Sequence, residues 1–150
     1  KLMCDKHVVK MILESAQMLC TAHHINGSML TKDEIYKPAY VNHPSTKWAR
    51  ESMEQYEWLY KHFCALCKEY TRRYGRVHIT DSKLNSLLSI YPSEFDSIGF
   101  DSPPKCMPDK YKKGSTVFAY RKYYVGDKKR FAKYTKTPVP SFLNQEIYNV

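Results

Sequence analysis

Glycine is scarce in this sequence, with 5 residues among 150, and the glycine-rich motifs that hold phosphates are missing. The patterns G-x-x-x-x-G-K-[ST], G-x-G-x-x-G and G-x-S-x-G do not occur, which excludes nucleotide hydrolysis by a P-loop. No apolar run approaches the ~20 residues that cross a bilayer, and residues 1–6 lack the apolar stretch and cleavage site of a secretory signal. We therefore expect a protein that does not span a membrane and that is located in the cytoplasm. If the protein is viral, this is the cytoplasm of the host cell.

Paired metal-binding motifs are also missing. The 5 cysteines are an odd number, which does not suit a small disulfide scaffold and fits a reducing compartment. Cys64 and Cys67 form a C-x-x-C motif, but no second motif accompanies it at zinc-finger spacing, and both cysteines fall within a predicted helix. We interpret them as core residues and expect neither a metal nor a cofactor. The H-x-E and P-C-x-x-C motifs of zinc deaminases are absent too.

Helical spacing dominates what is present, and no convincing strand alternation or internal repeat is found. With 43% hydrophobic and 26% charged residues, the chain can bury a core. We predict an all-α fold: a compact single-domain helical bundle over residues 1–150, with long ordered loops and a basic C-terminal segment. A short natural lead-in before Lys1 is also expected. Helices are predicted over about residues 5–24, 46–74, 81–90 and 115–125, with loops at 28–45 and 93–113 and an extended tail.

The helix ends are predicted from capping and breaking residues. Ser45 or Thr46 caps the long helix, and Gly75 stops it. Thr80 caps the next helix, and Gly126 ends the one that starts near residue 115. The basic stretch after Gly126 would add one further short helix.

Positive charge is concentrated in one segment. The chain carries a net charge of +9, and residues 105–136 alone hold 11 of the 24 Lys and Arg residues but only two of the 15 Asp and Glu residues. A segment of this kind is typical of a polyanion partner, although a solvated basic surface would have the same composition. Tyr and Phe residues lie between these cations and suit base stacking as well as an ordinary core helix.

A narrow polar stripe on the first predicted helix supplies the main catalytic candidates. His7, Lys10, Glu14 and Gln17 fall within an arc of about 80° on an otherwise largely apolar helix. If the stripe is buried, Lys10 is a candidate nucleophile or base; if it is exposed, Lys10 and Glu14 form an ordinary surface pair. Because most of its circumference is apolar, this helix needs neighbours on most sides, which a homodimer could supply in part.

The start of the long helix is a second candidate site. His43 precedes it, and a helix N-terminus presents free N–H groups that suit a phosphate or a carboxylate. His43 would bind an anion or transfer a proton there, or else only hydrogen-bond within its loop. Contacts to nucleic acid or phosphate are expected from Lys37, Arg50, Arg73, His78, Lys112, Lys113, Tyr120, Arg121, Lys122, Tyr124, Lys129, Arg130 and Lys133.

Several blocks of sequence are shared with a known family. They are residues 4–11 (CDKHVVKM), 14–19 (ESAQML), 36–38 (YKP), 42–44 (NHP) with Trp48, 70–78 (YTRRYGRVH), 119–124 (AYRKYY) and 131–134 (FAKY). Through these blocks, nearly the whole chain resembles a phage-encoded group described as pyrimidine-dimer DNA glycosylase-like, or endonuclease V-like.

The resemblance implies a small, basic, all-helical protein that flips a nucleotide out of DNA. The true enzymes attack the sugar C1′ with an N-terminal α-amine, form a Schiff base with the help of a carboxylate, and then cut the backbone by β-elimination. Glu14 would fill the carboxylate role. No residue of this chain matches the nucleophilic terminus by motif, so Lys10 takes that role on chemical grounds.

These observations are consistent with three functions. The leading hypothesis is a phage enzyme with DNA glycosylase or AP-lyase chemistry at a glycosidic carbon, with DNA or a nucleotide as its partner. The second is a nucleic-acid or nucleotide-binding phage protein without chemistry, for example one that modulates a host defence or a host complex; its binding would weaken steeply with salt. The third is an enzyme of a free nucleotide or nucleoside, which would bind long DNA weakly.

Overall fold

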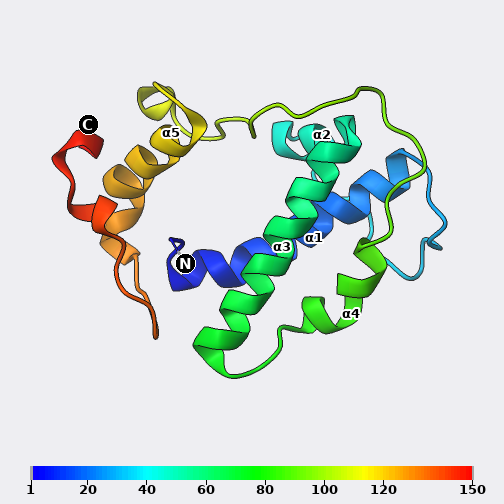
Figure 1. The fold of residues 1–150 in the computed structure, drawn as a ribbon, viewed down its shortest axis with the longest axis horizontal. Coiled ribbons are helices and arrows are strands. Elements are labelled where there is room, and N and C mark those ends of the chain that lie inside the picture. The colour runs from blue at the N-terminus through cyan, green and yellow to red at the C-terminus, as the bar shows by residue number, and fades with distance from the viewer. Residues whose placement is uncertain (1, 150) are drawn as a thin grey trace.

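The computed structural model describes residues 2–149 and is helical, which confirms the predicted all-α fold class. Within these residues the one β-type contact is an isolated bridge between Ser52 and Ser97. The α-helices are α1 (Asp5–Ile25), α2 (Pro44–Glu51), α3 (Met53–Tyr74), α4 (Ile79–Leu88) and α5 (Thr116–Tyr123), shown in Figure 1. Shorter helical turns are η1 (Asp109–Tyr111), η2 (Tyr124–Lys128), η3 (Lys129–Phe131), η4 (Ser141–Asn144) and η5 (Glu146–Tyr148).

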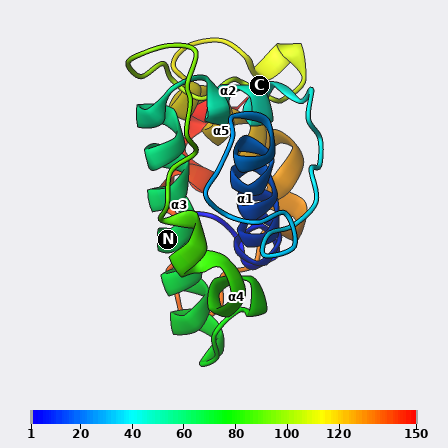
Figure 2. The same cartoon turned by 90° about the vertical axis from the view of Figure 1, so that its right-hand side faces the viewer.

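The main body of the molecule is built around α1, which packs against α2, α3 and α4 (Figure 2). Its residues Val8, Ile12 and Leu19 are buried at helical spacing among the apolar side chains of α3 and α4. Burying each such side chain contributes roughly 1.5–3 kcal/mol. The described helices do not include one that is both long and apolar enough to cross a membrane.

The long helix predicted over residues 46–74 is two helices, because the chain is extended at Ser52 (φ −139°, ψ 157°). The Ser52 hydroxyl accepts a hydrogen bond from the Gln55 amide (3.2 Å) and donates one to the Gly99 carbonyl (2.6 Å). The Gln55 side chain donates to the carbonyl of Trp48 at 2.5 Å. These contacts satisfy backbone groups that the break would leave unpaired. The predicted stop at Gly75 is confirmed by its left-handed backbone (φ 68°).

The boundaries predicted for α4 are wrong by two residues at each end. The helix begins at Ile79 and ends at Leu88, and its N-cap is His78 instead of Thr80. The His78 Nδ1 atom accepts a hydrogen bond from the Thr80 amide at 3.1 Å. The imidazole therefore performs the capping that we expected from the threonine hydroxyl.

The C-terminal region, residues 105–149, has small apolar clusters of its own. Tyr111 and Ala119 are buried in one of them, and Phe142 and Tyr148 in the other. The tail that we predicted to be extended forms η4 and η5, because burial of its aromatic residues folds it back onto the end of α5.

Gly126 does not end the helix that starts at Thr116. The chain continues through it as the π-helical turn η2, and a Cβ at Gly126 would lie 2.2 Å from the Tyr111 hydroxyl. Glycine is thus required here because the buried Tyr111 packs directly against its backbone.

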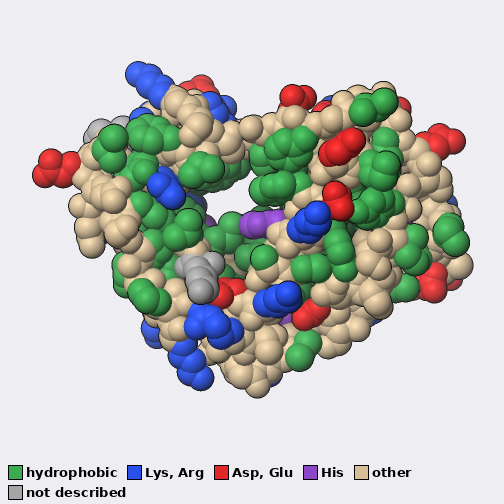
Figure 3. Space-filling model, viewed as in Figure 1, with side chains coloured by type: hydrophobic (Ala, Val, Ile, Leu, Met, Phe, Trp, Pro, Cys, Tyr) green, Lys and Arg blue, Asp and Glu red, His purple; other side chains and the backbone are tan. Residues whose placement is uncertain are grey.

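The C-terminal region lies beside the helical body and contacts it along two sides. On one side, residues 99–106 pass the starts of α2 and α3 on the way to α5 (Figure 1). On the other side, the beginning of α1 meets Tyr124, Phe131 and residues 133–137. Figure 3 shows an opening through the molecule between these contacts, with hydrophobic side chains and a histidine at its rim.

Candidate functional site

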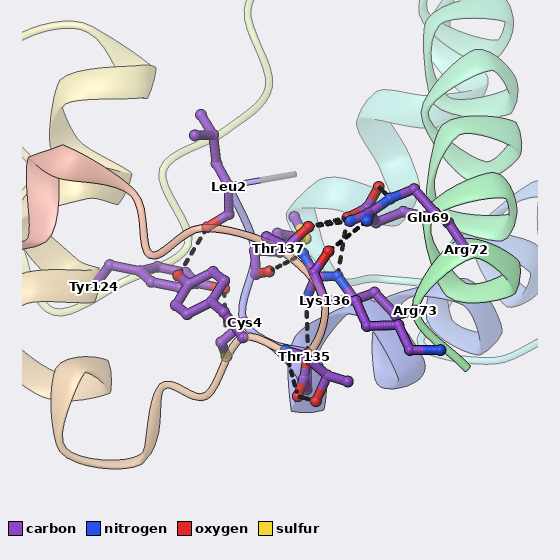
Figure 4. A network of polar contacts seen from close by, with 12 residues as sticks. Leu2, Cys4, Glu69, Arg72, Arg73, Tyr124, Thr135, Lys136 and Thr137 are labelled. Carbon is purple, nitrogen blue, oxygen red and sulfur yellow. Dashed lines mark hydrogen bonds and ion pairs between the residues drawn. The ribbon is translucent and has the colours of Figure 1, made fainter. Parts of the chain in front are cut away.

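A network of ion pairs and hydrogen bonds joins the first turn of α1, the last turns of α3 and residues 135–137 (Figure 4). The Arg73 side chain is completely buried and donates to Asp5 and Glu69, each at 2.9 Å. The Thr135 hydroxyl donates a hydrogen bond to Asp5 at 2.6 Å, and the Arg72 guanidinium donates one to the Lys136 carbonyl at 2.5 Å. This network fixes the start of α1 against the end of the basic segment.

The two carboxylates of this network are held in the charged form. Burial alone would raise the pKa of Asp5, but hydrogen bonds from Thr135 and Arg73 outweigh it and lower the pKa. Hydrogen bonds from Arg72, Arg73 and Thr137 lower the pKa of Glu69 to about 2, against the opposing effect of burial. Their partners are occupied within the protein, so these carboxylates are suited to structure and not to proton transfer near pH 7.

His7 on α1 meets Tyr124 of the basic segment next to this network. The His7 Nδ1 and the Tyr124 hydroxyl share a hydrogen bond of 2.5 Å, and the Cys4 Sγ lies 3.9 Å from the same hydroxyl. Phe131 packs edge-on against the imidazole with ring centroids 5.8 Å apart. The structure therefore brings together two candidates that are 117 residues apart in the sequence.

Cations surround this junction. Lys6 lies over the Phe131 ring at 5.2 Å, and Lys128 lies over the same ring at 5.7 Å. Burial lowers the pKa of His7, and the charges of Lys128, Lys10 and Lys6 lower it further. His7 is consequently neutral at pH 7, and a neutral imidazole can accept a proton. The positive charges of the surrounding lysines attract phosphate.

The rest of the predicted polar stripe lies along α1 from His7. The Lys10 Nζ is 3.3 Å from a Glu14 carboxylate oxygen, and the two side chains are 61% and 35% exposed. Lys10 and Glu14 therefore form a pair open to solvent, which is the second of the two possibilities that the sequence leaves open for them. Gln17 is half-buried further along the helix, and its carbonyl accepts a hydrogen bond from Thr21.

Most of the predicted phosphate contacts are at the surface of the C-terminal region. Arg121 is held between Phe142 and Tyr148, and it donates to the Tyr148 hydroxyl at 2.9 Å. Its Nε atom is buried without a hydrogen-bond partner among the described residues. The other basic candidates here are exposed or half-buried: Lys112, Lys113, Lys122, Lys129, Arg130 and Lys133.

Other predicted contacts have structural partners instead. The prediction that Arg73 contacts phosphate is wrong, because its side chain is fully buried and paired with carboxylates. His78 caps α4, and Arg50 donates to the Val41 carbonyl at 2.8 Å. The Tyr120 hydroxyl donates to the Pro104 carbonyl at 3.1 Å, which anchors the connecting chain.

The two remaining candidates lie in the loop region before α2. Lys37 is exposed, and His43 is exposed at the N-cap of α2, where its Nδ1 accepts from the Ser45 amide at 3.1 Å. None of the contacts that the structure gives His43 reaches the α1 stripe. The structure therefore does not join His43 to His7, Lys10 and Glu14.

The thiols do not form a metal site. All five cysteines are free, and Cys67 is buried as predicted for a core residue. Cys64 and Cys67 line a hollow of about 560 Å³ between α3 and α4, together with Asp81 and Asn85. Within residues 2–149, no group of three or more His, Cys, Asp or Glu side chains is arranged to hold a metal ion.

An aromatic cluster at the start of α3 was missed by the sequence reasoning. The Trp58 indole stacks on His62 with ring centroids 5.3 Å apart and planes 9° from parallel. Trp48 and Phe100 contact the same indole at 5.6 and 6.3 Å. One signal was available: Trp58 lies outside the apolar stripe of its helix, where a large ring is not needed for the core.

The comparison with known families agrees with the resemblance read from the sequence. A family model described as pyrimidine dimer DNA glycosylase matches residues 1–82, from the beginning of the chain into α4. The match covers more than half of the 150 residues, and the chain belongs to this family. No curated protein and no solved structure matches the chain significantly.

Proposed function

We propose that the protein is a DNA glycosylase with lyase-type chemistry, which binds DNA through residues 105–136 and reacts beside the start of α1. The observation that carries the proposal is the 2.5 Å hydrogen bond between His7 and Tyr124. It connects a helix inside the family match to the segment that holds a net charge of +9. Phosphates held by that segment would bring a sugar next to the polar stripe of α1.

Three members of the stripe, Lys10, Glu14 and His7, have chemical roles in this proposal. Glu14 takes the proton from the neighbouring Lys10 ammonium, and the freed amine attacks C1′ of the sugar as the C1′–N bond to the base breaks. The departing base takes a proton from the attacking amine. Glu14 then returns its proton to O4′ as the C1′–O4′ bond breaks, which leaves a protonated imine between Lys10 and the opened sugar. Neutral His7 then accepts the C2′ proton, and the 3′ phosphate leaves by β-elimination.

A second candidate function is nucleic-acid binding without chemistry, and the exposure of the Lys10–Glu14 pair favours it. Exposed pairs of this kind are common on helices and are worth only about 0.3–0.5 kcal/mol. An exposed lysine is also not made reactive by desolvation, which is the usual origin of a nucleophilic amine. The two candidates differ in turnover, which makes them separable by experiment.

The test uses a duplex that carries one cyclobutane pyrimidine dimer and measures both binding and strand cleavage. We expect cleavage at the dimer and none in the undamaged duplex. Glu14→Gln should lower the cleavage rate by about 100-fold or more, as removal of an acid–base group does, and should leave binding nearly unchanged.

Glu57→Gln is the matched control, since Glu57 on α3 forms an i,i+4 surface pair with Lys61 at the same 3.3 Å separation. It should cleave like the unchanged protein. If the unchanged protein binds the dimer-containing duplex but does not cleave it, the glycosylase proposal is contradicted and the non-catalytic one is supported. Full cleavage by Glu14→Gln would remove Glu14 from the mechanism.

A further inference from the structure

We infer that Trp58, supported by His62 and Phe100, is a stacking platform for an unpaired nucleobase of the DNA bound by the basic segment. The inference rests on the proposed DNA-binding function and adds a subsite to it. The platform is defined by Trp58 and two rings that contact it, His62 and Phe100.

The Trp58 ring is both exposed and held in place. The residue is 40% exposed and Phe100 is 48% exposed, yet three rings fix the orientation of the indole: the parallel His62, the perpendicular Trp48 and the tilted Phe100. Trp48 is itself buried, and its indole N–H donates to the Asp101 carbonyl at 2.9 Å. An exposed aromatic ring that is already ordered loses little entropy when a base stacks on it.

The position of the platform suits a base whose backbone is held elsewhere. It lies where α2, α3 and residues 99–101 meet, and these elements form one side of the opening, with the C-terminal region on the other (Figures 1 and 3). Bases stack on aromatic rings while Lys and Arg track the phosphates, which is how single-stranded nucleic acid is commonly bound.

Local charge separates these two roles. Glu54 accepts a hydrogen bond from the Gly99 amide at 3.2 Å, and Asp101 follows Phe100 directly, so carboxylates flank the platform. They repel a phosphate but not a neutral base. Burial also lowers the pKa of His62, which leaves a neutral imidazole under the indole at pH 7. The platform therefore takes the base, and the net +9 of residues 105–136 takes the backbone.

Tryptophan fluorescence tests the inference directly, because the protein has only two Trp residues and one of them is buried. The full chain is titrated with short oligothymidylate, with a duplex containing a single unpaired base, and with the fully paired duplex. We expect quenching by the first two and little by the paired duplex. Inorganic polyphosphate, which has charge but no bases, should bind without quenching.

Substitutions at Trp58 test whether the fluorescence quenching comes from this residue. Trp58→Phe should lose the quenching but keep most of the affinity, because Phe can also stack. Trp58→Ala should lower the affinity for oligothymidylate by about fivefold or more. Ile79→Ala removes another exposed apolar side chain, on α4, and should change neither quantity.

These experiments distinguish failure of the stacking platform from failure of the proposed DNA-binding function. Quenching that persists in Trp58→Phe, or an unchanged affinity in Trp58→Ala, would overturn the platform while leaving DNA binding intact. Absence of any binding to DNA would overturn the proposed function itself, and the platform with it.

Discussion

His23 is a buried histidine whose two nitrogens are both hydrogen-bonded. The Tyr56 hydroxyl donates to the Leu88 carbonyl at 2.8 Å, so it accepts from the His23 Nε2–H at 2.8 Å. The unprotonated Nδ1 then accepts from the Ser28 hydroxyl at 2.5 Å. This arrangement needs the neutral ring, and burial lowers the pKa of His23 to about 4.

The first prediction is a loss of stability in acid that depends on His23. The unfolded chain takes up the proton as the pH falls through about 6.5, whereas the folded protein does so only near pH 4. The free energy of unfolding should therefore fall by up to about 3 kcal/mol between pH 6.5 and 4. Urea unfolding across this range measures it.

The matched variants separate this residue from the other histidines. His23→Gln should be less stable at pH 7 but lose less stability on acidification. His43→Asn replaces an exposed histidine and keeps a side chain that can cap α2, so its pH dependence should match that of the unchanged protein. Equal pH dependence in all three proteins would contradict the role given to His23.

At the scale of elements, the periodicity of the sequence predicts the helices well and their junctions poorly. The first helix is predicted nearly to its observed end, because no Gly or Pro interrupts residues 5–25. The break at Ser52 was missed because the helical pattern continues on both sides of it. The available clue was the spacing of Ser52 and Gln55, which is that of a capping box.

The candidate site was predictable in its parts but not in its assembly. The α1 stripe follows from spacing alone, whereas the contact between His7 and Tyr124 depends on how the chain returns after 117 residues. The prediction that Arg73 contacts phosphate was wrong. Its spacing after Leu66 and Tyr70 places it on the buried face of α3, and that spacing could have identified it.

The second prediction concerns the element that connects the two parts of the molecule, residues 133–137. Thr135→Val removes the 2.6 Å hydrogen bond from the hydroxyl to the Asp5 carboxylate. Bonds to charged groups are worth about 1.5–3 kcal/mol, so we expect destabilisation of this order. Amide hydrogen exchange in residues 133–137 should be faster in Thr135→Val than in the unchanged protein, with little change in α3.

Thr71→Val is the control, because Thr71 is half-buried on α3 and has no side-chain hydrogen bond within residues 2–149. It should leave residues 133–137 as protected as in the unchanged protein. Uniform loss of protection over the whole molecule in Thr135→Val would contradict a local connecting role for this residue.

At the scale of the whole molecule, charge and family match fall on different parts of the chain. The family model covers residues 1–82, which form the body built on α1, whereas residues 105–136 carry a charge equal to that of the entire chain. In the proposed function, the body supplies the reacting groups, and the C-terminal region supplies the attraction for phosphates.

The third prediction is the salt dependence of DNA binding. Each phosphate contact contributes a slope of about −0.9 to the logarithmic plot of affinity against salt on duplex DNA. The double variant Lys129→Gln/Arg130→Gln removes two exposed cations and should reduce this slope by up to about 2. Fluorescence anisotropy at several salt concentrations measures it.

Lys32→Gln/Lys47→Gln removes the same charge from two exposed positions outside the basic segment. Its slope should stay close to that of the unchanged protein. Equal reductions in both double variants would mean that binding follows net charge alone and that residues 105–136 form no specific interface.

The central claim is that chemistry at the sugar carbon takes place on the α1 stripe beside the basic segment. Borohydride trapping with a labelled duplex that contains an abasic site tests it most directly. We predict a covalent adduct that maps to the peptide of α1 with Lys10, is lost in Lys10→Ala and persists in Lys61→Ala. No adduct in a sample that still binds DNA in a salt-sensitive way, or an adduct on another residue, would contradict the claim.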